Sequence, residues 1–449
     1  MKTQYYTAEF LFYEGKFQKN LVLEVSEGTI TQVVPVSKVK SQKVRDLGNV
    51  ALLPGTVNTH NHSFQSLVRG FGDDMNFFDW RDKGIYKYSL NLNSKDIYVG
   101  ALFAFGEMLK QGVTTVCDFF YIQDGGNDNA RAVIQAAKDV GIRLVLARCF
   151  YDWAKAPKKY QETPEEARKR YLELVKEYKG NPMVTICPAP HSPHAASETM
   201  IKTAFEVAQE THSSFHMHVS EGKYEVEMIQ KEKGLTPLLY LEKLGIVTDK
   251  MVVIHGVWFT DSEIALMAER GVKLSYNPSS NMFLGDGITP IQKMLDQHIT
   301  IGLGTDGACS NNKTSIFEEM RMAALLQKVY LLDSSALSAE RVFQMGTHNG
   351  GKVLGLPIGK LEAGHRADFV TLDLNCLEMQ PLQNLHKNVV YSFSPRAIQD
   401  VYVQGKKVFS KGEILTVPEE EIIQRVKKVT QGWRPSPLSP PLRGGVRGG

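Results

Sequence analysis

The sequence predicts an α/β protein: a (β/α)8, TIM-like barrel joined to a small β-sandwich domain that the N- and C-terminal segments build together. Three observations support this prediction. The length of 449 residues suits one large barrel with an appended domain. The middle of the chain alternates short apolar runs with long amphipathic stretches. Both ends of the chain alternate apolar and polar residues between glycine turns.

The two ends of the chain predict antiparallel strands. Residues 1–54 contain short runs with the period-two pattern of half-buried strands. The same texture returns after the middle of the chain, where residues 400–409 predict a hairpin that turns at Gly405 and Lys406. Because these stretches flank the middle of the chain, we assign residues 1–54 and 362–417 to one β-sandwich domain.

Residues 55–361 are assigned to the catalytic barrel. Strands of a parallel sheet are buried on both faces, so they are expected as continuous apolar runs. Eight such runs follow one another, with helical stretches between them, as eight βα units require. The runs are residues 55–62, 114–121, 143–150, 183–191, 214–218, 251–255, 272–277 and 299–306. The helical stretches include residues 96–111, 130–140, 164–178, 198–211 and 262–270. Beyond the sandwich we expect a C-terminal helix at 418–434 and a disordered, Pro/Gly-rich tail at 435–449.

Composition and charge exclude several classes of protein. The 52 basic and 49 acidic residues give a net charge of +3, so we expect no nucleic-acid groove. No apolar run reaches the roughly 18 residues of a membrane span, and the first residues lack the apolar stretch of a secretory signal. We therefore expect a cytoplasmic location and no membrane partner. Apart from these observations, we expect a small-molecule partner and a homo-oligomeric state, dimer or tetramer. Five scattered cysteines without a CxxC pair predict reduced, buried thiols.

Polar residues stand at the C-terminal ends of the predicted strands, where a barrel enzyme keeps its active site. The chain has only 12 histidines, yet the first, fourth, fifth and sixth strands each end in one, and the eighth ends in Asp306. A single histidine on an apolar strand is more often a packed core residue than a ligand, but the joint pattern favours one shared site. The polar ends are His60, His62, Tyr121, His191, His218, His255, Asn277 and Asp306.

These strand ends carry the ligands that a metal ion needs. His60 and His62 are two residues apart on one strand, so they share a face and can both reach a central ion. His216 and His218 also share a face, and periodicity does not choose between them; we favour His218 because it lies closer to the strand end. Three imidazoles and Asp306 make a set that suits Zn²⁺, with Fe²⁺ as an alternative, and a water completes it.

Glu221 and His255 are the candidates for acid/base catalysis. Glu221 lies three residues past His218, at the rim of the barrel, where it could move a proton from an activated water to the substrate. His255 could polarise the same water, and we count Asp306 as a catalytic residue as well as a ligand. The alternative for Glu221 is a solvated carboxylate in the acidic stretch 221–227.

These motifs together resemble the amidohydrolase superfamily, and within it the zinc aminohydrolases. This branch includes methylthioadenosine/S-adenosylhomocysteine deaminases, atrazine- or triazine-type hydrolases and formimidoylglutamate deiminases. The motifs are residues 53–55, 60–62, 218–221, 255, 277–281 and 304–307, and the resemblance extends over residues 1–430. The metal ligands that it implies are His60, His62, His218 and Asp306, and the proton-transfer residues are Glu221 and His255. Binuclear members carry a lysine at the end of the fourth strand, which has none here, so the resemblance implies one metal ion per chain.

The substrate is left between two parts of that branch. Residues 284–291 and 306–312 resemble the adenosine-type deaminases, but the glutamate by which those enzymes hold the ribose has no counterpart at 85–89. Residues 62–65 and 78–81 resemble the formimidoylglutamate deiminases, in which Gln, Arg and Tyr contact an amino-acid-like substrate. The substrate-binding residues that we expect are Gln65, Arg81, Tyr121, His191 and His194.

Both parts of the branch release ammonia from an sp² carbon. We therefore expect a metal-dependent hydrolase of non-peptide C–N bonds that deaminates an amino-substituted heterocycle, purine- or adenosine-like. The alternatives are a deiminase of formimino or guanidino amino acids and a triazine-type hydrolase. A catalytically silent binding protein, the alternative from another class, predicts the loss of a ligand or of the acid/base pair, and the sequence retains them all.

Overall fold

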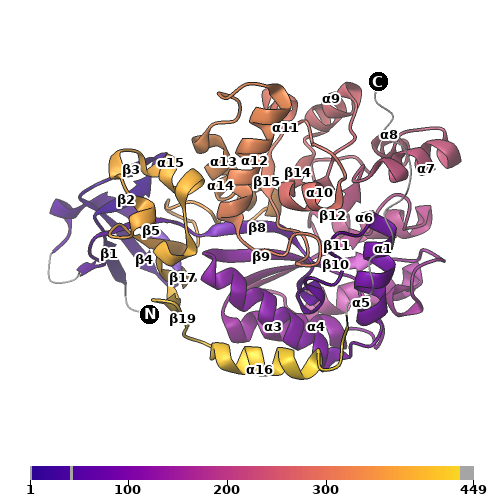
Figure 1. Cartoon of the computed structure of the whole chain (residues 1–449), viewed down its shortest axis with the longest axis horizontal. Helices are drawn as coiled ribbons and strands as arrows, with labels where there is room; N and C mark the ends of the chain where they lie inside the picture. Colours follow the sequence, from indigo (N-terminus) through magenta and orange to yellow (C-terminus); the bar gives the residue numbers. More distant parts are fainter. Residues whose placement is uncertain (1–2, 41–43, 435–449) are drawn as a thin grey trace.

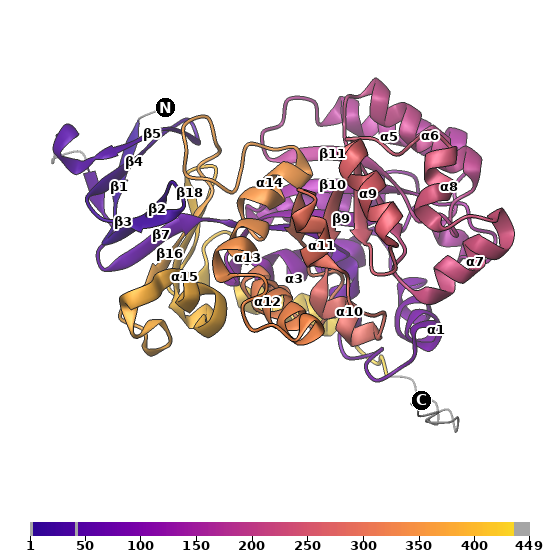
Figure 2. The ribbon, with the colours of Figure 1, turned by 90° about the horizontal axis from the view of Figure 1, so that it is seen from above.

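The structure is a computed structural model that describes residues 3–40 and 44–434. Strands from both ends of the chain lie together beside a larger body of strands and helices (Figures 1 and 2). The tail at 435–449, for which the sequence predicts disorder, lies outside the described residues. Over those two described ranges, no helix combines the length and the apolar character that crossing a bilayer demands.

Two four-stranded parallel sheets form the centre of the larger body. Their strand orders are β11-β10-β9-β8 and β12-β13-β14-β15. Each of the eight apolar runs overlaps one of these strands. The largest difference is at 299–306, where the strand covers only residues 301–303 and Asp306, beyond its end, adopts a φ of 59°. The strands are β8 (Thr56–Asn61), β9 (Val113–Phe120), β10 (Arg143–Phe150), β11 (Val184–Pro190), β12 (Phe215–Val219), β13 (Met251–His255), β14 (Lys273–Tyr276) and β15 (Ile301–Leu303).

Backbone hydrogen bonds connect the two parallel sheets at both of their edges. The amide of His218, in β12, donates to the carbonyl of His191, just after β11, over 3.1 Å. The amide of Asp306, after β15, donates to the carbonyl of His60 in β8 over 3.0 Å. Since both bonds lie at the C-terminal ends of the strands, the polar residues that follow these strands are brought close to one another.

Amphipathic helices surround the two sheets. Several begin at a side-chain cap; at α5, Thr163 accepts from the amide of Glu166, whose carboxylate accepts from the amide of Thr163, and Pro164 takes the first helical position. The helices are α3 (Ser94–Lys110), α4 (Asp128–Val140), α5 (Pro164–Glu177), α6 (Glu198–Glu210), α7 (Lys223–Lys233), α8 (Pro237–Lys243), α9 (Asp261–Arg270), α10 (Pro278–Leu284), α11 (Ile291–Asp296), α12 (Ile316–Leu331), α13 (Ala339–Met345) and α14 (His348–Leu354).

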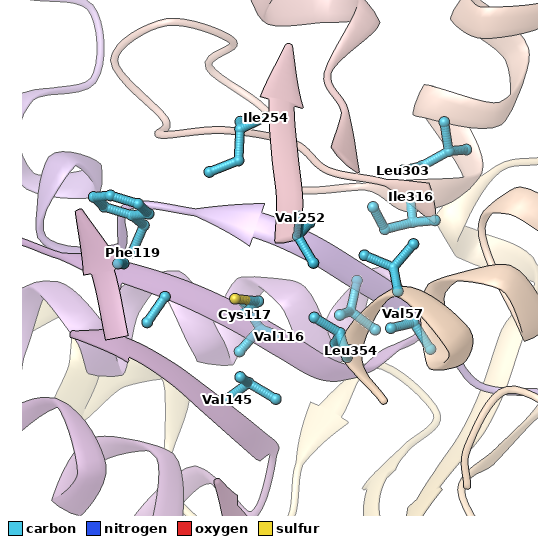
Figure 3. Close-up of a cluster of buried hydrophobic side chains, with 14 of the residues drawn as sticks. Val57, Val116, Cys117, Phe119, Val145, Val252, Ile254, Leu303, Ile316 and Leu354 are labelled. Carbon is cyan, nitrogen blue, oxygen red and sulfur yellow. The ribbon is translucent and has the colours of Figure 1, made fainter. Parts of the chain in front are cut away.

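The main core lies between these strands and helices. Val57 of β8, Cys117 of β9 and Val145 of β10 lie in one apolar cluster with Val252 of β13 and Leu303 of β15 (Figure 3). None of the five exposes more than 1% of its surface. The two parallel sheets therefore share a core, which fixes the strand ends above it.

The strands from the two ends of the chain form a second unit. A seven-stranded sheet has the order β19-β18-β17-β16-β7-β2-β3, in which β16 pairs antiparallel with β7 and so joins the C-terminal to the N-terminal segment. A four-stranded sheet has the order β5-β4-β1-β6. It shares a small apolar core with the seven-stranded sheet, and this core includes Tyr6, Leu23 and Phe369. The strands are β1 (Gln4–Thr7), β2 (Phe10–Tyr13), β3 (Lys16–Gln18), β4 (Leu21–Ser26), β5 (Thr29–Pro35), β6 (Val44–Asp46), β7 (Val50–Pro54), β16 (Phe369–Asp373), β17 (Ile398–Val403), β18 (Lys406–Ser410) and β19 (Glu413–Ile414).

The C-terminal elements differ from the prediction in three details. Residues 377–397, which lie inside the segment assigned to the β-sandwich domain, form short helical turns. The hairpin turns at Gln404 and Gly405, one residue earlier than predicted, because these two residues adopt the positive φ values, 52° and 72°, that a tight hairpin turn requires. The C-terminal helix, α16 (Glu419–Val429), ends before residue 434, where Gly432 with a φ of 83° redirects the chain. α16 lies along α3 (Figure 1).

Candidate active site

A cavity opens at the C-terminal ends of the parallel strands. It brings together all five residues expected to bind substrate with four of the six expected to bind metal or transfer protons. His60 and His255, the other two, are fully buried and lie against this group. The lining residues are His62, Gln65, Phe77, Trp80, Arg81, Ile85, Tyr86, Tyr121, Tyr151, Trp153, His191, Ser192, His194, His218, Glu221, Tyr224 and Asp306.

Three histidines and an aspartate form a metal-binding cluster in the floor of the cavity. The ligand atoms of His60, His62 and His218 lie within 4.8 Å of one another, and so do those of His60, His255 and Asp306. The Nε2 atoms of His60 and His62 each lie 3.4 Å from the same carboxylate oxygen of Asp306, Oδ1. Such spacing around one point is what a single small cation requires.

The surroundings of the histidines leave ring nitrogens available for a cation. The Nδ1 atom of His62 lies 2.6 Å from the carbonyl oxygen of Phe119, and that of His218 lies 2.9 Å from the carbonyl oxygen of His191. A carbonyl only accepts, so Nδ1 carries the hydrogen and the lone pair of Nε2 faces the cluster. Both ring nitrogens of His60 are buried and have no hydrogen-bond partner. These residues therefore fit a divalent ion.

Burial sets the charge state of the cluster. It lowers the pKa of His60 to about 3 and also lowers the pKa values of His62 and His218, so the three imidazoles are neutral, as metal ligands must be. Burial would raise the pKa of Asp306, but the close contact with His60 and the nearby rings of His62 and His255 hold it well below the usual value. The cluster thus offers three neutral nitrogens and one carboxylate.

Two serines orient the carboxylate of Asp306. Its Oδ2 atom accepts from the hydroxyl of Ser280 over 2.6 Å and from that of Ser310 over 3.0 Å, and its Oδ1 atom accepts from the amide of Gly307 over 2.7 Å. Sequence reasoning did not identify either serine as a site residue, because nothing in the local pattern distinguishes the hydroxyl of Ser280, in α10, or of Ser310, in a loop, from that of a surface serine.

Glu221 and His255 lie side by side above the cluster. The His255 Nε2 atom is 3.5 Å from the Glu221 Oε1 atom. On the other side of the ring, His255 Nδ1 donates to Asn281 Oδ1 over 2.8 Å, which directs Nε2 towards Glu221. Burial raises the pKa of Glu221 well above its usual value, and the charges of Asp306 and Glu225 add to the shift. A carboxyl group in this state can hold a proton and release it to a substrate.

The structure separates the two histidines of β12. His218 belongs to the cluster, whereas the Nδ1 atom of His216 lies 3.8 Å from the Sγ atom of Cys117, deeper between the strands. The Nε2 atom of His216 has no hydrogen-bond partner. His216 therefore lies in the interior of the body and does not join the ligand set.

The walls of the cavity are aromatic. Tyr151 and Trp153 follow the third strand, β10, where the sequence reasoning placed no site residue, and Tyr86 lies on η4 (Trp80–Tyr86), a π-helical stretch. Tyr151 stacks on His191 with ring centroids 4.3 Å apart. A tyrosine that directly follows an apolar strand was the available signal for Tyr151, as it was for Tyr121.

Arg81 is the only lysine or arginine among the described residues that line the cavity, and Glu221 and Asp306 are the only acids there. Its guanidinium donates to both carboxylate oxygens of Asp82, over 2.7 and 3.1 Å. It also lies over the rings of Tyr86 and Trp153, at 5.4 and 5.6 Å from their centroids.

A buried acid outside the lining, Asp286, is a further residue that sequence reasoning missed; burial and the charge of Glu221 raise its pKa to about 8.

The sequence matches those of known proteins over most of its length. Residues 51–408 match the model of the amidohydrolase family. The chain is 34% identical over 419 residues to a 5'-deoxyadenosine deaminase of Methanosphaera stadtmanae, which covers 93% of this chain and 96% of that protein. It is 33% identical over 441 residues to a 5-methylthioadenosine/S-adenosylhomocysteine deaminase of Bacillus cytotoxicus, which covers 96% and 99%.

Solved structures agree with the fold. A zinc-bound adenosine deaminase from Xanthomonas campestris superposes with a TM-score of 0.88 at 27% identity over 95% of this chain and 97% of that one. An atrazine chlorohydrolase from Arthrobacter aurescens TC1, complexed with zinc, superposes with a TM-score of 0.88 at 22% identity over 95% and 99%. These likenesses confirm a TIM-barrel-like α/β fold and the resemblance that the motifs predict. The chain belongs to the amidohydrolase family.

Proposed function

We propose that this amidohydrolase is a deaminase that hydrolyses the exocyclic C–N bond of an adenine-type ring and releases ammonia. The observation that carries the proposal is the placement of Glu221 and His255 directly beside the His/His/His/Asp cluster, at the floor of an aromatic-walled cavity. Two relatives at 33–34% identity are named as deaminases of 5'-deoxyadenosine and of 5-methylthioadenosine and S-adenosylhomocysteine, which supports an adenine-type substrate.

The proposal includes one divalent metal ion per chain, Zn²⁺ with Fe²⁺ as the alternative, held by His60, His62, His218 and Asp306. When bound in such a site, the ion lowers the pKa of a coordinated water to about 7 and so supplies the nucleophile at neutral pH. The similar adenosine deaminase structure from Xanthomonas campestris contains bound zinc, which supports Zn²⁺ as the ion. A single ion is further supported by β11, whose sequence VTICPAP offers no lysine that could bridge two metals.

Glu221 and His255 then carry the protons of the reaction. One hydrogen of the attacking water goes through Glu221 to the ring nitrogen beside the reacting carbon. Glu221 returns the other to the departing amine, so that the C–N bond breaks with release of neutral ammonia and a carbonyl remains on the ring. His255, held by Asn281, presents Nε2 towards Glu221 and keeps its carboxyl group aimed at the reacting atoms.

The walls suit a flat heterocycle. Tyr86, Tyr121, Tyr151 and Trp153 supply faces for stacking. Gln65 donates its Nε2 hydrogen to the hydroxyl of Tyr121 over 3.0 Å, while its Oε1 atom is buried without a hydrogen-bond partner. An unpaired buried acceptor is costly unless the substrate supplies a donor, so Gln65 selects a substrate with an N–H group at this position.

A second candidate function is favoured by Arg81. A ribose diol is commonly held by a carboxylate, and the described lining offers none besides Glu221 and Asp306. Arg81 is instead a cation at the mouth of the cavity, suited to an acidic substrate such as a formimino or guanidino amino acid. His191 and His194, whose pKa values burial lowers, add neutral hydrogen-bonding groups rather than charge.

An ammonia-release assay separates the two candidates. The zinc-loaded enzyme would be offered adenosine, 5'-deoxyadenosine, methylthioadenosine, adenine, an aminotriazine and formiminoglutamate, with Glu221→Gln as the blank. Turnover of an adenine derivative supports the proposal. Turnover of formiminoglutamate alone would replace it by the second candidate, and turnover of the triazine alone would place the enzyme with the triazine hydrolases. No ammonia from any of these would overturn the reaction itself.

We also propose the architecture in finer detail. The eight parallel strands close into one barrel at 55–361, a closure supported by the hydrogen bonds His218 N to His191 O and Asp306 N to His60 O. The strands at 1–54 and 362–417 make one β-sandwich domain.

A dimer or tetramer is supported by a run of exposed apolar side chains at the end of α12, where Val329 exposes 70% and Leu332 92% of its surface. Light scattering after size exclusion tests the assembly.

A further inference from the structure

The end of the described chain packs against the back of the active-site wall. After α16 ends at Val429, the chain turns and the indole of Trp433 meets two buried or half-buried rings. Its ring centroid lies 4.9 Å from that of Tyr88 and 6.1 Å from that of Phe71, and these two rings are themselves 4.7 Å apart. The hydroxyl of Tyr88 donates to the backbone carbonyl of Arg434. The three rings and this hydrogen bond fasten the segment that follows α16 to the body.

The residues that Trp433 contacts flank the segment that forms one wall of the cavity. η4 (Trp80–Tyr86) supplies four lining side chains, and Tyr88 follows it directly in α2 (Lys87–Ser89). η4 is also held by the indole of Trp80, which donates to the carbonyl of Cys309 over 2.8 Å. The wall is therefore anchored at two places, and the C-terminal segment provides one of them.

A second set of contacts continues from Tyr88 to the interior of the cavity. Its neighbour Ser89 shares a hydrogen bond with the hydroxyl of Tyr160, which is fully buried. The ring of Tyr160 lies 5.1 Å from that of Tyr121 and 5.5 Å from that of Tyr86, both of which line the cavity. A displacement of Tyr88 is thus transmitted to two residues that face the substrate, since closely packed interiors transmit strain.

We propose that Trp433 is a positioning residue for substrate binding: by holding Tyr88 it fixes η4, so that Arg81 and Tyr86 keep their places in the cavity wall. Trp433 is not among the residues that line the cavity and lies outside the metal-binding cluster. Its loss loosens the wall without altering His60, Glu221 or the groups around them. The effect is then on substrate affinity and not on the chemical step.

Hydrogen–deuterium exchange and steady-state kinetics on full-length, zinc-loaded protein test this role. In Trp433→Ala the amides of 80–90 should exchange faster, while those of α4 (Asp128–Val140) keep their rates. KM should rise about 2- to 12-fold, the factor that corresponds to one lost aromatic pair, with kcat unchanged. Trp433→Phe should restore both values. Ile423→Ala, at an exposed apolar position of α16, is the matched control and should resemble the wild type.

The exchange measurement does not depend on the substrate, so it separates this proposal from the proposed function. Unchanged exchange at 80–90 in Trp433→Ala would overturn the positioning role, even if activity fell. If Ile423→Ala changed the exchange at 80–90 as much as Trp433→Ala does, truncating a side chain of α16 would be enough to cause the effect. That result would also overturn the positioning role of Trp433. A fall in kcat with loss of zinc would place the effect at the cluster and contradict it as well.

Discussion

The Nε2 atom of His255 lies 3.5 Å from the Oε1 atom of Glu221, and the opposite side of the His255 ring is fixed by Asn281. Glu221, the proposed proton carrier, therefore lies beside an imidazole ring whose orientation is set by Asn281, a residue that does not line the cavity. His255 reaches this position through a left-handed backbone conformation with a φ of 72°, uncommon for any residue but glycine. Such strain is retained where the surrounding structure over-determines it, here by hydrogen bonds to both the ring and the carbonyl of His255.

Glu221→Gln should abolish most turnover while zinc binding stays intact. The amide keeps the shape of the side chain but cannot accept and release the proton, so kcat should fall by a factor on the order of 10² or more. Metal content by mass spectrometry and ammonia release give the two values. Glu227→Gln, an exposed glutamate on α7, is the control and should be unaffected. Near-normal turnover in Glu221→Gln would remove this residue from the mechanism.

Asn281→Ala should impair catalysis through His255. Without the acceptor for Nδ1, the ring loses the hydrogen bond that selects its tautomer and orientation, and losses of about 10- to 100-fold are typical for such supporting partners. Asn281→Asp keeps an oxygen at this place and should retain more activity than Asn281→Ala. Single-turnover kinetics compare the two variants, and equal losses in both would mean that packing, and not the acceptor, is what matters.

His218→Gln and His216→Gln should differ in metal content although the two residues are neighbours on one strand. His218 supplies Nε2 to the cluster, whereas His216 lies beside Cys117. His218→Gln should lose zinc after dialysis, and His216→Gln should keep about one equivalent per chain. Retained metal in His218→Gln, measured against the His216→Gln control, contradicts the ligand assignment.

The residues at the strand ends could be predicted from the sequence because the active site of a parallel barrel lies at the C-terminal ends of its strands. Polar residues that follow apolar runs meet at one end of a parallel arrangement, and this rule alone predicts that His60, His218 and Asp306 lie close together. Periodicity alone could not separate His218 from His216, since both point to the same face; only their distances along the strand axis distinguish them.

The supporting residues could not be predicted for a physical reason. Asn281 contacts His255 across 26 positions of sequence, and Ser280 contacts Asp306 across the same interval, so their roles arise only when α10, which carries both residues, packs against the strand ends. Trp153 and Tyr86 lie on segments with no periodic pattern. The Trp433 contact with Tyr88 joins segments that lie far apart in the sequence, and no local pattern indicates it.

Asp118→Asn should change how stability depends on pH. Asp118 of β9 is fully buried, and its carboxylate accepts from the amide and the hydroxyl of Ser63, over 2.6 and 2.9 Å, just after the His60–His62 pair. Burial raises the pKa of Asp118 to about 7, although both bonds from Ser63 act to lower it. In the unfolded chain the pKa is about 3.9. The folded state therefore binds this proton more tightly than the unfolded state.

It follows that the stabilisation from protonated Asp118 is complete below pH 3.9 and is lost as the pH rises towards 7. Asparagine stays neutral at every pH, so the melting temperature of Asp118→Asn relative to the wild type should increase between pH 5 and pH 8. The expected gain is at least about 2 °C. Because the comparison is between two proteins at each pH, the other titrating groups cancel. Calorimetry on zinc-loaded protein gives the difference, and a constant or falling difference would show that Asp118 is already ionised at pH 5 in the folded state.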